Sequence, residues 1–382
     1  MRVIMLLGRS TGGIGTHVAQ LCADLRDRGV EVLVVTHPLT AEHFDLGPVR
    51  LCWPGSTGMA HALADFRLLR RLASTADIVH AHGHQAGLLA TLATRSVPSR
   101  HGPKLIVSQH NAVLEGSGRA GFKRLAQRWV ARRADLVTGA SSDLVEDALS
   151  FGAGRAELAE VPSPRVPGLL ALQPADPPAR SGIRRTLLSS LAHSSQTAAV
   201  VAPVDLEVPL VVTISRIAPQ KNLTVLVQAA SQLREPCTWV VLGTGDPKLL
   251  AQLRLQASVL GAPLHFVGSR DDVDQWLRAA EVFVLPSQWE ARALVVQESM
   301  AAGTPVVATD VGGLSDLVRG TGLVVPPGDP VAIAKATDRL LVDPVLRDEL
   351  AARGRERATA LPDGSDTAEK WLAWYGETQL MT

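Results

Sequence analysis

The chain has 382 residues, a formal net charge of +1, 46% hydrophobic residues and 20% charged residues. At about 100–200 residues per domain, this length predicts two globular domains, and the apolar content excludes general disorder. The balanced charge gives no polyanion-binding signal, and only 4% of the residues are aromatic, so nucleic acid is excluded as the main partner.

The cysteines and the hydropathy indicate the compartment. Cys22, Cys52 and Cys237 lie far apart, without CxxC or metal-ligand spacing, which favours a reducing compartment. The apolar run at 3–7 is too short for a signal peptide, and no stretch approaches the 18 or so residues of a membrane span. We therefore expect a soluble, cytoplasmic protein, for which peripheral contact with the inner face of the plasma membrane stays open.

The first half of the chain alternates short apolar runs with helical patterns. A buried strand is predicted at 3–7, then a glycine-rich turn, a helix at about 16–28 that Gly29 closes, and a strand at 30–36. Further short strands are predicted at 78–81, 105–108 and 136–139, each followed by a helical stretch. This alternation predicts a parallel sheet with helices on both faces, in an N-terminal domain over 1–160.

The pattern degrades between 161 and 209, where prolines and serines predict a linker with one short helix near 183–192. Strands are then predicted at 210–214, 239–242, 264–267, 282–285, 305–308 and 323–325, which gives a second domain over 210–366. The last helix, 367–380, is amphipathic. The fold class is α/β with two doubly wound, Rossmann-like parallel sheets, and the default ligand site is a cleft shared by the carboxyl ends of their strands.

Two segments that follow strands carry the strongest chemical signals. Glu290 lies in a loop and Glu298 in the first turns of the next helix, whose N-terminal N–H groups suit a phosphate. Arg216 and Lys221 follow the strand at 210–214, and two cations beside a helix N-terminus can hold a diphosphate. Two solvated glutamates and an ordinary basic loop are the alternatives, although only 6 of the 38 basic residues are lysines, which makes Lys221 stand out.

The order of these segments resembles the family 4 glycosyltransferases of the GT-B fold. The most specific part is Glu290 and Glu298, with seven residues between them, followed by Met-Ala-Ala-Gly-Thr-Pro-Val-Val-Ala-Thr. Other matching segments occur in order along the chain: Gly12-Gly13-Ile-Gly-Thr-His17, Asp77-Ile-Val-His-Ala-His82, the strand ending at His110, Ser215-Arg216…Lys221-Asn222, Leu242-Gly-Thr-Gly245, Gly312-Gly313 and Val325-Pro-Pro-Gly-Asp329. The resemblance covers most of the chain outside 161–209.

The resemblance implies roles for particular residues. Arg216 and Lys221 would hold the diphosphate of a UDP-, GDP- or ADP-sugar, Glu298 the ribose and Glu290 the sugar hydroxyls. Backbone groups around Gly268 and Arg270 would hold the base, and the first-turn residues Leu294 and Val295 would offer N–H groups. Gly12 and Gly13 would allow the backbone to approach the ligand, and His110 would face the reacting carbon. The final helix commonly packs back on the first domain in this fold.

The family is typically retaining and needs no metal or other cofactor, so we expect a hexosyltransferase whose fixed cations and helix N-terminus do the work of a metal. The departing phosphate would take the proton of the acceptor on the same face of the sugar. The acceptor is not identified, and a cell-envelope or membrane-proximal glycoconjugate is one candidate. A catalytically silent nucleotide-binding scaffold and a nucleotide-sugar epimerase are the alternative functions.

The chain departs from the family pattern in three places. Ser215 replaces the usual glycine before Arg216. Ala291-Arg292-Ala293 replaces Gly-Phe-Gly, which preserves backbone donation if φ stays negative at both alanines. Gly15 stands where relatives often carry a longer side chain facing the acceptor.

Three further features have competing interpretations. His80, His82 and His84 alternate, and packing competes there with a metal site or a ligand-facing role for His82. Asp272-Val-Asp274 has the D-x-D form of metal-dependent transferases, but it opens a helix and helix capping is the expected role. Residues 119–133 form a basic amphipathic helix with Arg119, Phe122 and Trp129, which suits an anionic membrane surface or simply a solvated face. His17, in the first predicted helix, either contacts the acceptor or is a buried, hydrogen-bonded histidine.

Overall fold

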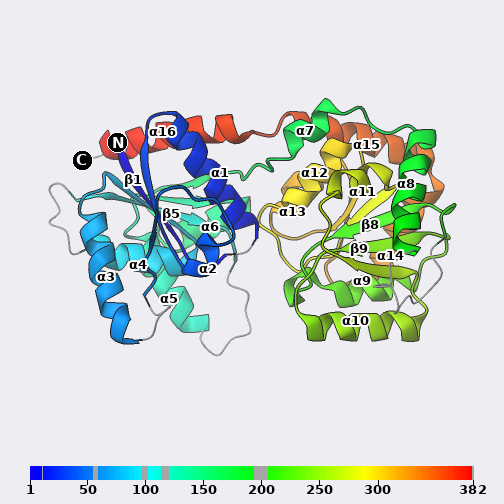
Figure 1. Ribbon diagram of the computed structural model, residues 1–382, viewed down its shortest axis with the longest axis horizontal. Coiled ribbons are helices and arrows are strands. Elements are labelled where there is room, and N and C mark those ends of the chain that lie inside the picture. The colour runs from blue at the N-terminus through cyan, green and yellow to red at the C-terminus, as the bar shows by residue number, and fades with distance from the viewer. Residues whose placement is uncertain (11, 55–58, 96–101, 113–119, 193–204, 381–382) are drawn as a thin grey trace. The chain divides into compact units, whose positions relative to one another are not determined.

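The computed structural model describes residues 1–10, 12–54, 59–95, 102–112, 120–192 and 205–380. Two compact units divide the chain, one formed by Met1–Pro164 with Pro362–Thr382 and the other by Arg165–Leu361. Figure 1 shows a twisted sheet with helices on both faces in each unit. The predicted fold class, two Rossmann-like doubly wound α/β units, is confirmed.

The first unit contains a seven-stranded, all-parallel sheet in the order β3-β2-β1-β4-β5-β6-β7. Its described elements are β1 (Arg2–Leu7), α1 (Gly13–Asp27), β2 (Glu31–Thr36), α2 (Pro38–Ala41), β3 (Val49–Leu51), α3 (Met59–Ala73), β4 (Ile78–His82), α4 (His84–Thr94), β5 (Lys104–Gln109), α5 (Ala120–Ala131), β6 (Leu136–Gly139), α6 (Ser142–Ser150), β7 (Ala156–Leu158) and α16 (Gly364–Leu380).

The second unit contains a six-stranded, all-parallel sheet in the order β10-β9-β8-β11-β12-β13. Its described elements are α7 (Val166–Ala171), α8 (Pro177–Ala192), β8 (Leu210–Ile214), η2 (Pro219–Lys221), α9 (Leu223–Ala230), β9 (Thr238–Leu242), α10 (Pro247–Leu260), β10 (Leu264–Gly268), α11 (Val273–Ala279), β11 (Val282–Leu285), α12 (Leu294–Ala302), β12 (Val306–Thr309), α13 (Gly313–Val318), β13 (Leu323–Val325), α14 (Pro330–Val342) and α15 (Pro344–Thr359).

Side chains along the central strands point alternately to the two faces of the second sheet, so that a hydrophobic core forms on each face. Val212 of β8 packs into the cluster under α8, α11 and α12, whereas its neighbour Val211 packs into the cluster under α9, α10 and α14. Successive side chains of a strand point to opposite faces, so a fully apolar strand serves both layers. The short apolar runs of the sequence are therefore central, doubly covered strands.

The segment 161–209 differs from the expected linker. Its described part forms α7 and α8, whose Val166, Leu169, Leu187 and Leu188 are buried in the core of the second unit. The density of prolines has a simple reason: Pro177 lies in the first turn of α8, where its missing N–H group costs nothing.

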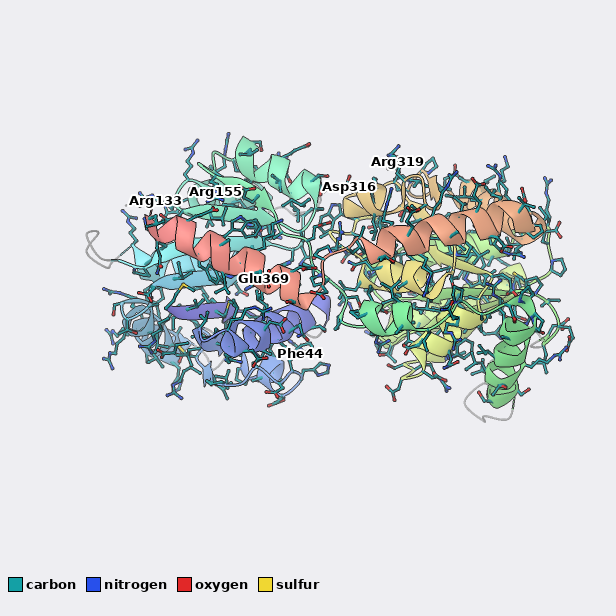
Figure 2. All side chains as sticks on the ribbon, turned by 90° about the horizontal axis from the view of Figure 1, so that it is seen from above. Phe44, Arg133, Arg155, Asp316, Arg319 and Glu369 are labelled. Carbon is teal, nitrogen blue, oxygen red and sulfur yellow. The ribbon has the colours of Figure 1, made fainter. Side chains whose placement is uncertain are left out.

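The last helix of the chain completes the core of the first unit. In Figure 1, α16 (red) runs along α1 (dark blue), and Figure 2 shows the same two helices from above. Trp371, Trp374 and Tyr375 are buried against β1 and α1. The Arg155 guanidinium, labelled beside α16 in Figure 2, donates to the Glu377 carboxylate over 2.8 Å.

Candidate active site

The strand order of the second sheet reverses between β8 and β11, because the chain adds β9 and β10 on one side of β8 and β11 to β13 on the other. Doubly wound sheets bind ligands at the carboxyl ends of the strands that flank such a point. Ser215 to Asn222 follow β8 there, and Ser287 to Ala293 follow β11. The two segments selected from the sequence therefore lie at the switch point.

The structure brings Lys221 and Glu290 into direct contact. The Lys221 ammonium forms an ion pair with Oε1 of Glu290, and the two side chains are only 14% and 10% exposed. Ser287 Oγ donates a hydrogen bond of 2.6 Å to the same Oε1. Two groups thus hold one oxygen of a buried carboxylate, as a buried charge requires. The alternative of two solvated glutamates does not hold at Glu290, which is buried.

Backbone and amide contacts fasten the two loops together. The Gln220 side-chain amide donates to the Trp289 carbonyl over 2.8 Å, and the Gln288 N–H donates to the Gln220 carbonyl over 2.8 Å. These bonds fix the distance between the loop that carries Lys221 and the loop that carries Glu290. Neither Gln220 nor Ser287 had been assigned a role from the sequence. Both residues could have been selected from the sequence by position, because Gln220 precedes Lys221 and Ser287 lies near the end of β11, in the loop that carries Glu290.

Gly312 and Gly313 hold the backbone of Glu290 from the far side. The Gly313 N–H donates to the Glu290 carbonyl over 2.9 Å. Gly312 has φ +47°, and a Cβ there would lie 2.2 Å from the same carbonyl oxygen. Only glycine combines this backbone conformation with such a close approach. The Gly312-Gly313 pair of the sequence is therefore explained by its contact with the glutamate loop.

Asn222 also has a conformational explanation. It has φ +51°, the only positive φ of a non-glycine residue in the described ranges, and its carbonyl accepts the Val225 N–H at the start of α9. Asparagine tolerates the left-handed region better than most residues. Asparagine at this position therefore forms the turn that places Lys221.

Helix α12 begins directly after the Glu290 loop. Its N-cap residue is Ala293, which has no side-chain acceptor for the N–H groups of the first turn. Leu294 and Val295 are its first two residues, and Glu298 is buried one turn further along. Ala293 has φ −77°, and Ala291 is not among the positive-φ residues. The backbone is thus intact where the chain departs from Gly-Phe-Gly.

The other residues predicted for the nucleotide lie on neighbouring loops. Arg216 is exposed directly after β8. Gly268 ends β10 with φ +77°, and its carbonyl accepts the Gly243 N–H over 2.8 Å. The Arg270 guanidinium is engaged by both carboxylate oxygens of Asp272, at 3.0 and 2.8 Å, so only the backbone of Arg270 stays open to the predicted role.

Asp272-Val-Asp274 opens helix α11, as the helix-capping interpretation expects. Asp272 occupies the N-cap position of α11, but its side chain makes no capping hydrogen bond. Its carboxylate instead accepts from Arg270 and from Trp276 Nε1, at 3.1 Å for the latter, and the guanidinium holds the pKa of Asp272 below its ordinary value. Asp274 does lie in the first turn of α11.

In the first unit, the glycine-rich turn opens α1. Gly12 is the N-cap residue and Gly13 the first helical residue, and the Gly15 N–H donates to Ser10 Oγ over 3.1 Å. A Cβ at Gly15 would lie 2.2 Å from the Phe44 ring, which is labelled in Figure 2. The space in which relatives often carry a longer side chain is therefore filled by Phe44.

Three predicted histidines gather at the carboxyl ends of β4 and β5. His82 Nδ1 and His110 Nε2 are hydrogen-bonded at 3.1 Å, with their rings stacked at 5.3 Å between centroids. The His17 ring of α1 lies 5.7 Å from that of His110 and 6.0 Å from that of His82. All three side chains are buried, and the sequence had not predicted that they meet.

The His80 ring lies 4.1 Å from that of His82, between ring centroids, and it also joins a buried chain of hydrogen bonds. Its Nδ1 meets the Tyr375 hydroxyl at 2.8 Å, its Nε2 meets Ser108 Oγ at 2.7 Å, and Ser108 Oγ meets Thr138 Oγ1 at 2.7 Å. Strands β4, β5 and β6 are thereby linked to α16. Packing is the right interpretation for this histidine. His84 differs again, since it starts α4 and its Nε2 meets the Asn111 carbonyl at 2.7 Å.

Burial sets the charge of these histidines. It lowers the pKa of His110 to about 3 and that of His17 to about 4, with neighbouring imidazoles adding to the effect at His110. The pKa of His82 is lowered well below its ordinary value for the same reasons. The cluster therefore presents neutral rings at neutral pH, which donate and accept hydrogen bonds but carry no charge.

Among the residues that the structure describes, no group of three or more His, Cys, Asp or Glu side chains could hold a metal ion. No helix in those ranges is long and apolar enough to cross a membrane. The basic helix is present as α5, with Lys123, Arg124 and Arg128 exposed, whereas Arg119 and the Phe122 side chain lie outside the described part.

Two doubly wound units, with a lysine–glutamate pair at the switch point of the second, form the GT-B type of fold. Family comparison agrees: the model of glycosyl transferases group 1 matches residues 208–343, and that of the glycosyl transferase 4-like domain matches residues 12–164. The chain belongs to this glycosyltransferase family.

Curated relatives are similar over nearly the whole chain. A Kineococcus radiotolerans protein named D-inositol 3-phosphate glycosyltransferase is 31% identical over 420 residues, which cover 95% of this chain and 90% of that protein. The alpha-D-kanosaminyltransferase of Streptomyces kanamyceticus is 33% identical over 161 residues, 40% of this chain and 41% of that protein. These names favour neither the silent scaffold nor the epimerase.

Solved structures share the fold. The crystal structure of Anabaena HepE in complex with UDP and glucose has a TM-score of 0.79 at 20% identity, covering 99% of this chain and all of that one. Sucrose-phosphate synthase from Thermosynechococcus elongatus has a TM-score of 0.75 at 23% identity, with full coverage of both chains. The predicted GT-B fold is thereby confirmed.

Proposed function

We propose that this glycosyltransferase moves a hexosyl group from a nucleotide-diphosphate sugar to an acceptor hydroxyl, with retention at the anomeric carbon and without a metal ion. The observation that carries the proposal is the buried contact between Lys221 and Glu290 at the switch point of the second sheet. It holds a cation suited to a diphosphate beside a carboxylate suited to sugar hydroxyls, in the place where such sheets bind ligands.

The diphosphate is proposed to lie against two cations and one helix end. Lys221 is fixed by Glu290, whereas Arg216 is exposed and can turn toward an anion. The N–H groups of Leu294 and Val295 open a helix whose N-cap residue has no side-chain acceptor. Positive partial charge at a helix N-terminus favours an anion, and fixed cations stabilise the charge that grows on a departing phosphate.

The rest of the donor is assigned to neighbouring groups. Glu290 is proposed to accept hydrogen bonds from the sugar hydroxyls with its second oxygen, and Glu298, buried one turn into α12, from the ribose hydroxyls. The backbone of Gly268 and Arg270 is proposed to hold the base. UDP-glucose is the first donor to test, because HepE has been crystallised with UDP and with UDP-glucose. GDP- and ADP-sugars are the alternatives.

The chemical step proposed has no covalent enzyme intermediate. The bond between the anomeric carbon and the phosphate oxygen breaks, and its electron pair leaves with the diphosphate. The acceptor oxygen bonds to the same face of that carbon, and its proton passes to the departing phosphate oxygen. His110 is proposed to contact the sugar as a neutral ring, which adds no positive charge beside a carbon that is itself becoming positive.

Two acceptor classes are proposed for testing. D-inositol 3-phosphate comes first, since it appears in the name of a relative of which this chain covers 90%. A membrane-proximal glycoconjugate is second, because α5 exposes Lys123, Arg124, Arg128 and the apolar Leu125, which is 66% exposed. A basic face with an apolar residue suits an anionic lipid surface. Co-sedimentation with phosphatidylglycerol vesicles separates the two classes, and absence of binding removes the second.

The decisive experiment follows the slow hydrolysis of each nucleotide sugar without an acceptor, and then transfer to D-inositol 3-phosphate. Lys221→Met is expected to lower kcat by about 10²–10³, the usual loss when a group that stabilises transition-state charge is removed. Lys335→Met, an exposed lysine of α14, is the matched control. Nucleotide binding without turnover points to the silent scaffold, and recovery of an epimerised nucleotide sugar points to the epimerase.

Retention at the anomeric carbon and independence of a metal ion are each tested by a separate measurement. Proton NMR of the product gives the anomeric configuration, and an inverted centre contradicts retention. A covalent sugar–enzyme adduct in the mass spectrum contradicts the same-face step. Turnover is expected to survive dialysis against EDTA, and a loss that Mg²⁺ or Mn²⁺ restores contradicts metal independence.

A further inference from the structure

The second unit contains a large cavity that the proposed reaction does not use. Its volume is about 660 Å³, within the range of small-molecule sites. Pro209 and Glu281, which line it, directly precede β8 and β11, so the cavity lies at the amino ends of the strands whose carboxyl ends carry Lys221 and Glu290. Helices α8 (green) and α15 (orange), both seen in Figure 1, supply most of its wall.

Two of the charges in this wall are already neutralised by each other. Arg184 Nη1 donates to Glu281 Oε1 over 2.8 Å, and both residues are buried. Glu281 Oε2 accepts the Leu210 N–H over 2.6 Å. This pair therefore joins α8 to the beginnings of β8 and β11 and has a structural task. The carboxylate of Glu207 is likewise held by Arg185, at 2.9 and 2.8 Å.

A second arginine of the wall is also engaged. Arg355 donates to the carbonyls of Leu170 and Leu172, at 2.7 Å each, where α7 ends. It fixes one side of the cavity and brings a positive charge there, whose acceptors among the described residues are backbone carbonyls.

Arg180 and Arg347 are different. The Nε atom of each is buried, and neither has a hydrogen-bond partner among the residues that the structure describes. Arg347 makes only a long contact of 3.3 Å from Nη1 to the Leu340 carbonyl. Burial lowers the pKa of Arg180; the carboxylates of Glu281 and Asp348 oppose this shift, and the charge of Arg347 adds to it. Two guanidinium groups whose buried Nε–H groups lack acceptors, and whose charges repel each other, are what a bound anion would satisfy.

The remaining charges and surfaces define the kind of anion. Asp176 and Asp348 line the cavity, but both are exposed, and Asp176 already accepts the Ala179 N–H at the start of α8. Ala351, Ala352 and Pro174 add apolar wall. The cavity is larger than a phosphate ion, so there is room for an organic body beside the anionic group.

We propose that this cavity binds a small phosphate monoester, whose phosphate lies between Arg180 and Arg347 and whose organic part lies against the apolar wall. A planar guanidinium group can donate two parallel hydrogen bonds to two oxygens of one phosphate, whereas an ammonium group cannot. The site is separate from the donor groups and does not depend on the proposed function.

The test is calorimetric titration of the full chain with glucose 6-phosphate, inorganic phosphate, glucose and acetate. Saturable binding of glucose 6-phosphate is expected, with weaker binding of inorganic phosphate and none of glucose. Repeating the titration with UDP present separates this site from the donor site, because UDP is expected to leave it free. Displacement by UDP would assign the binding to the donor site and overturn the proposal.

Variants localise the binding. Arg180→Ala and Arg347→Ala are each expected to weaken glucose 6-phosphate binding by at least about tenfold. Arg353→Ala, an exposed α15 residue outside the cavity, is the matched control. Arg180→Lys keeps the charge but cannot donate two parallel hydrogen bonds to a phosphate. We expect this variant to bind glucose 6-phosphate weakly and to have the melting temperature of the wild type. No saturable binding, unchanged binding in both alanine variants, or equal binding of acetate would each overturn the proposal.

Discussion

Replacing Lys221 with methionine removes the cation from an ion pair whose side chains are 14% and 10% exposed, and leaves the buried Glu290 charged. Breaking such a pair by deleting one partner costs about 3–5 kcal/mol, because the remaining charge is buried without compensation. Ser287 Oγ still donates to Glu290 Oε1, so we expect the lower end, about 3 kcal/mol. For a unit of this size that corresponds to a fall in melting temperature of about 6–12 °C.

A second substitution, at Glu290, shows whether the uncompensated charge of this carboxylate causes the loss of stability. Glu290→Gln in the Lys221→Met background removes the charge but keeps an acceptor for Ser287. Urea unfolding of the wild type, both single variants and the double variant gives a double-mutant cycle. We expect the double variant to recover about 2 kcal/mol of the loss. If the two single effects instead add to within about 0.5 kcal/mol, the pair does not interact and the reasoning fails.

Three further predictions concern stability. The unfolding free energy should fall as the pH drops from about 6.5 toward 4, because histidines with a folded pKa near 3 or 4 take up protons on unfolding, each contributing about 1.4 kcal/mol per pH unit. His110→Asn should flatten this slope in urea titrations, whereas the exposed His61→Asn should leave it unchanged. Gly312→Ala should lower the free energy of unfolding by at least about 2 kcal/mol. The control is Gly320→Ala, where φ is also positive but a Cβ would meet nothing within 4 Å, and it should lower the free energy of unfolding by about 1 kcal/mol. Equal losses would argue against the contact of Gly312 with the glutamate loop. Tyr375→Phe should lower stability by about 1 kcal/mol in the same assay by breaking the bond to His80, and an unchanged value would mean that the bond contributes nothing.

The central strands could be predicted because both faces of each are covered. Their runs of Val, Ile and Leu are continuous, as at Val282–Leu285. The edge strands β3 (Val49–Leu51) and β7 (Ala156–Leu158) were missed, since each has three residues with a charged one at the centre. The equally short edge strand β13 (Leu323–Val325) was predicted because all three of its residues are apolar.

Only the second half of α8 was predicted, as the short helix near 183–192, and its start was missed. Asp176-Pro177 places a carboxylate and a proline at the first turn, as Asp329-Pro330 does for α14. The prolines nearby made the same signal resemble a linker. At the site, the resemblance selected Lys221 and Glu290, but spacing along the chain could not show that the two side chains touch, or that His17, His82 and His110 meet. Those contacts depend on the strand order, which no local pattern encodes.

Nucleotide binding tests the central claim most directly. Thermal unfolding of the wild type is measured with UDP, GDP, ADP and their sugars at millimolar concentration, where a ligand at 100 times its dissociation constant adds about 2.7 kcal/mol. We predict that one nucleotide series raises the melting temperature and that Lys221→Met loses this ligand-induced rise while Lys335→Met keeps it. No rise with any nucleotide would contradict the assignment of the Lys221–Glu290 site to a nucleotide-sugar donor.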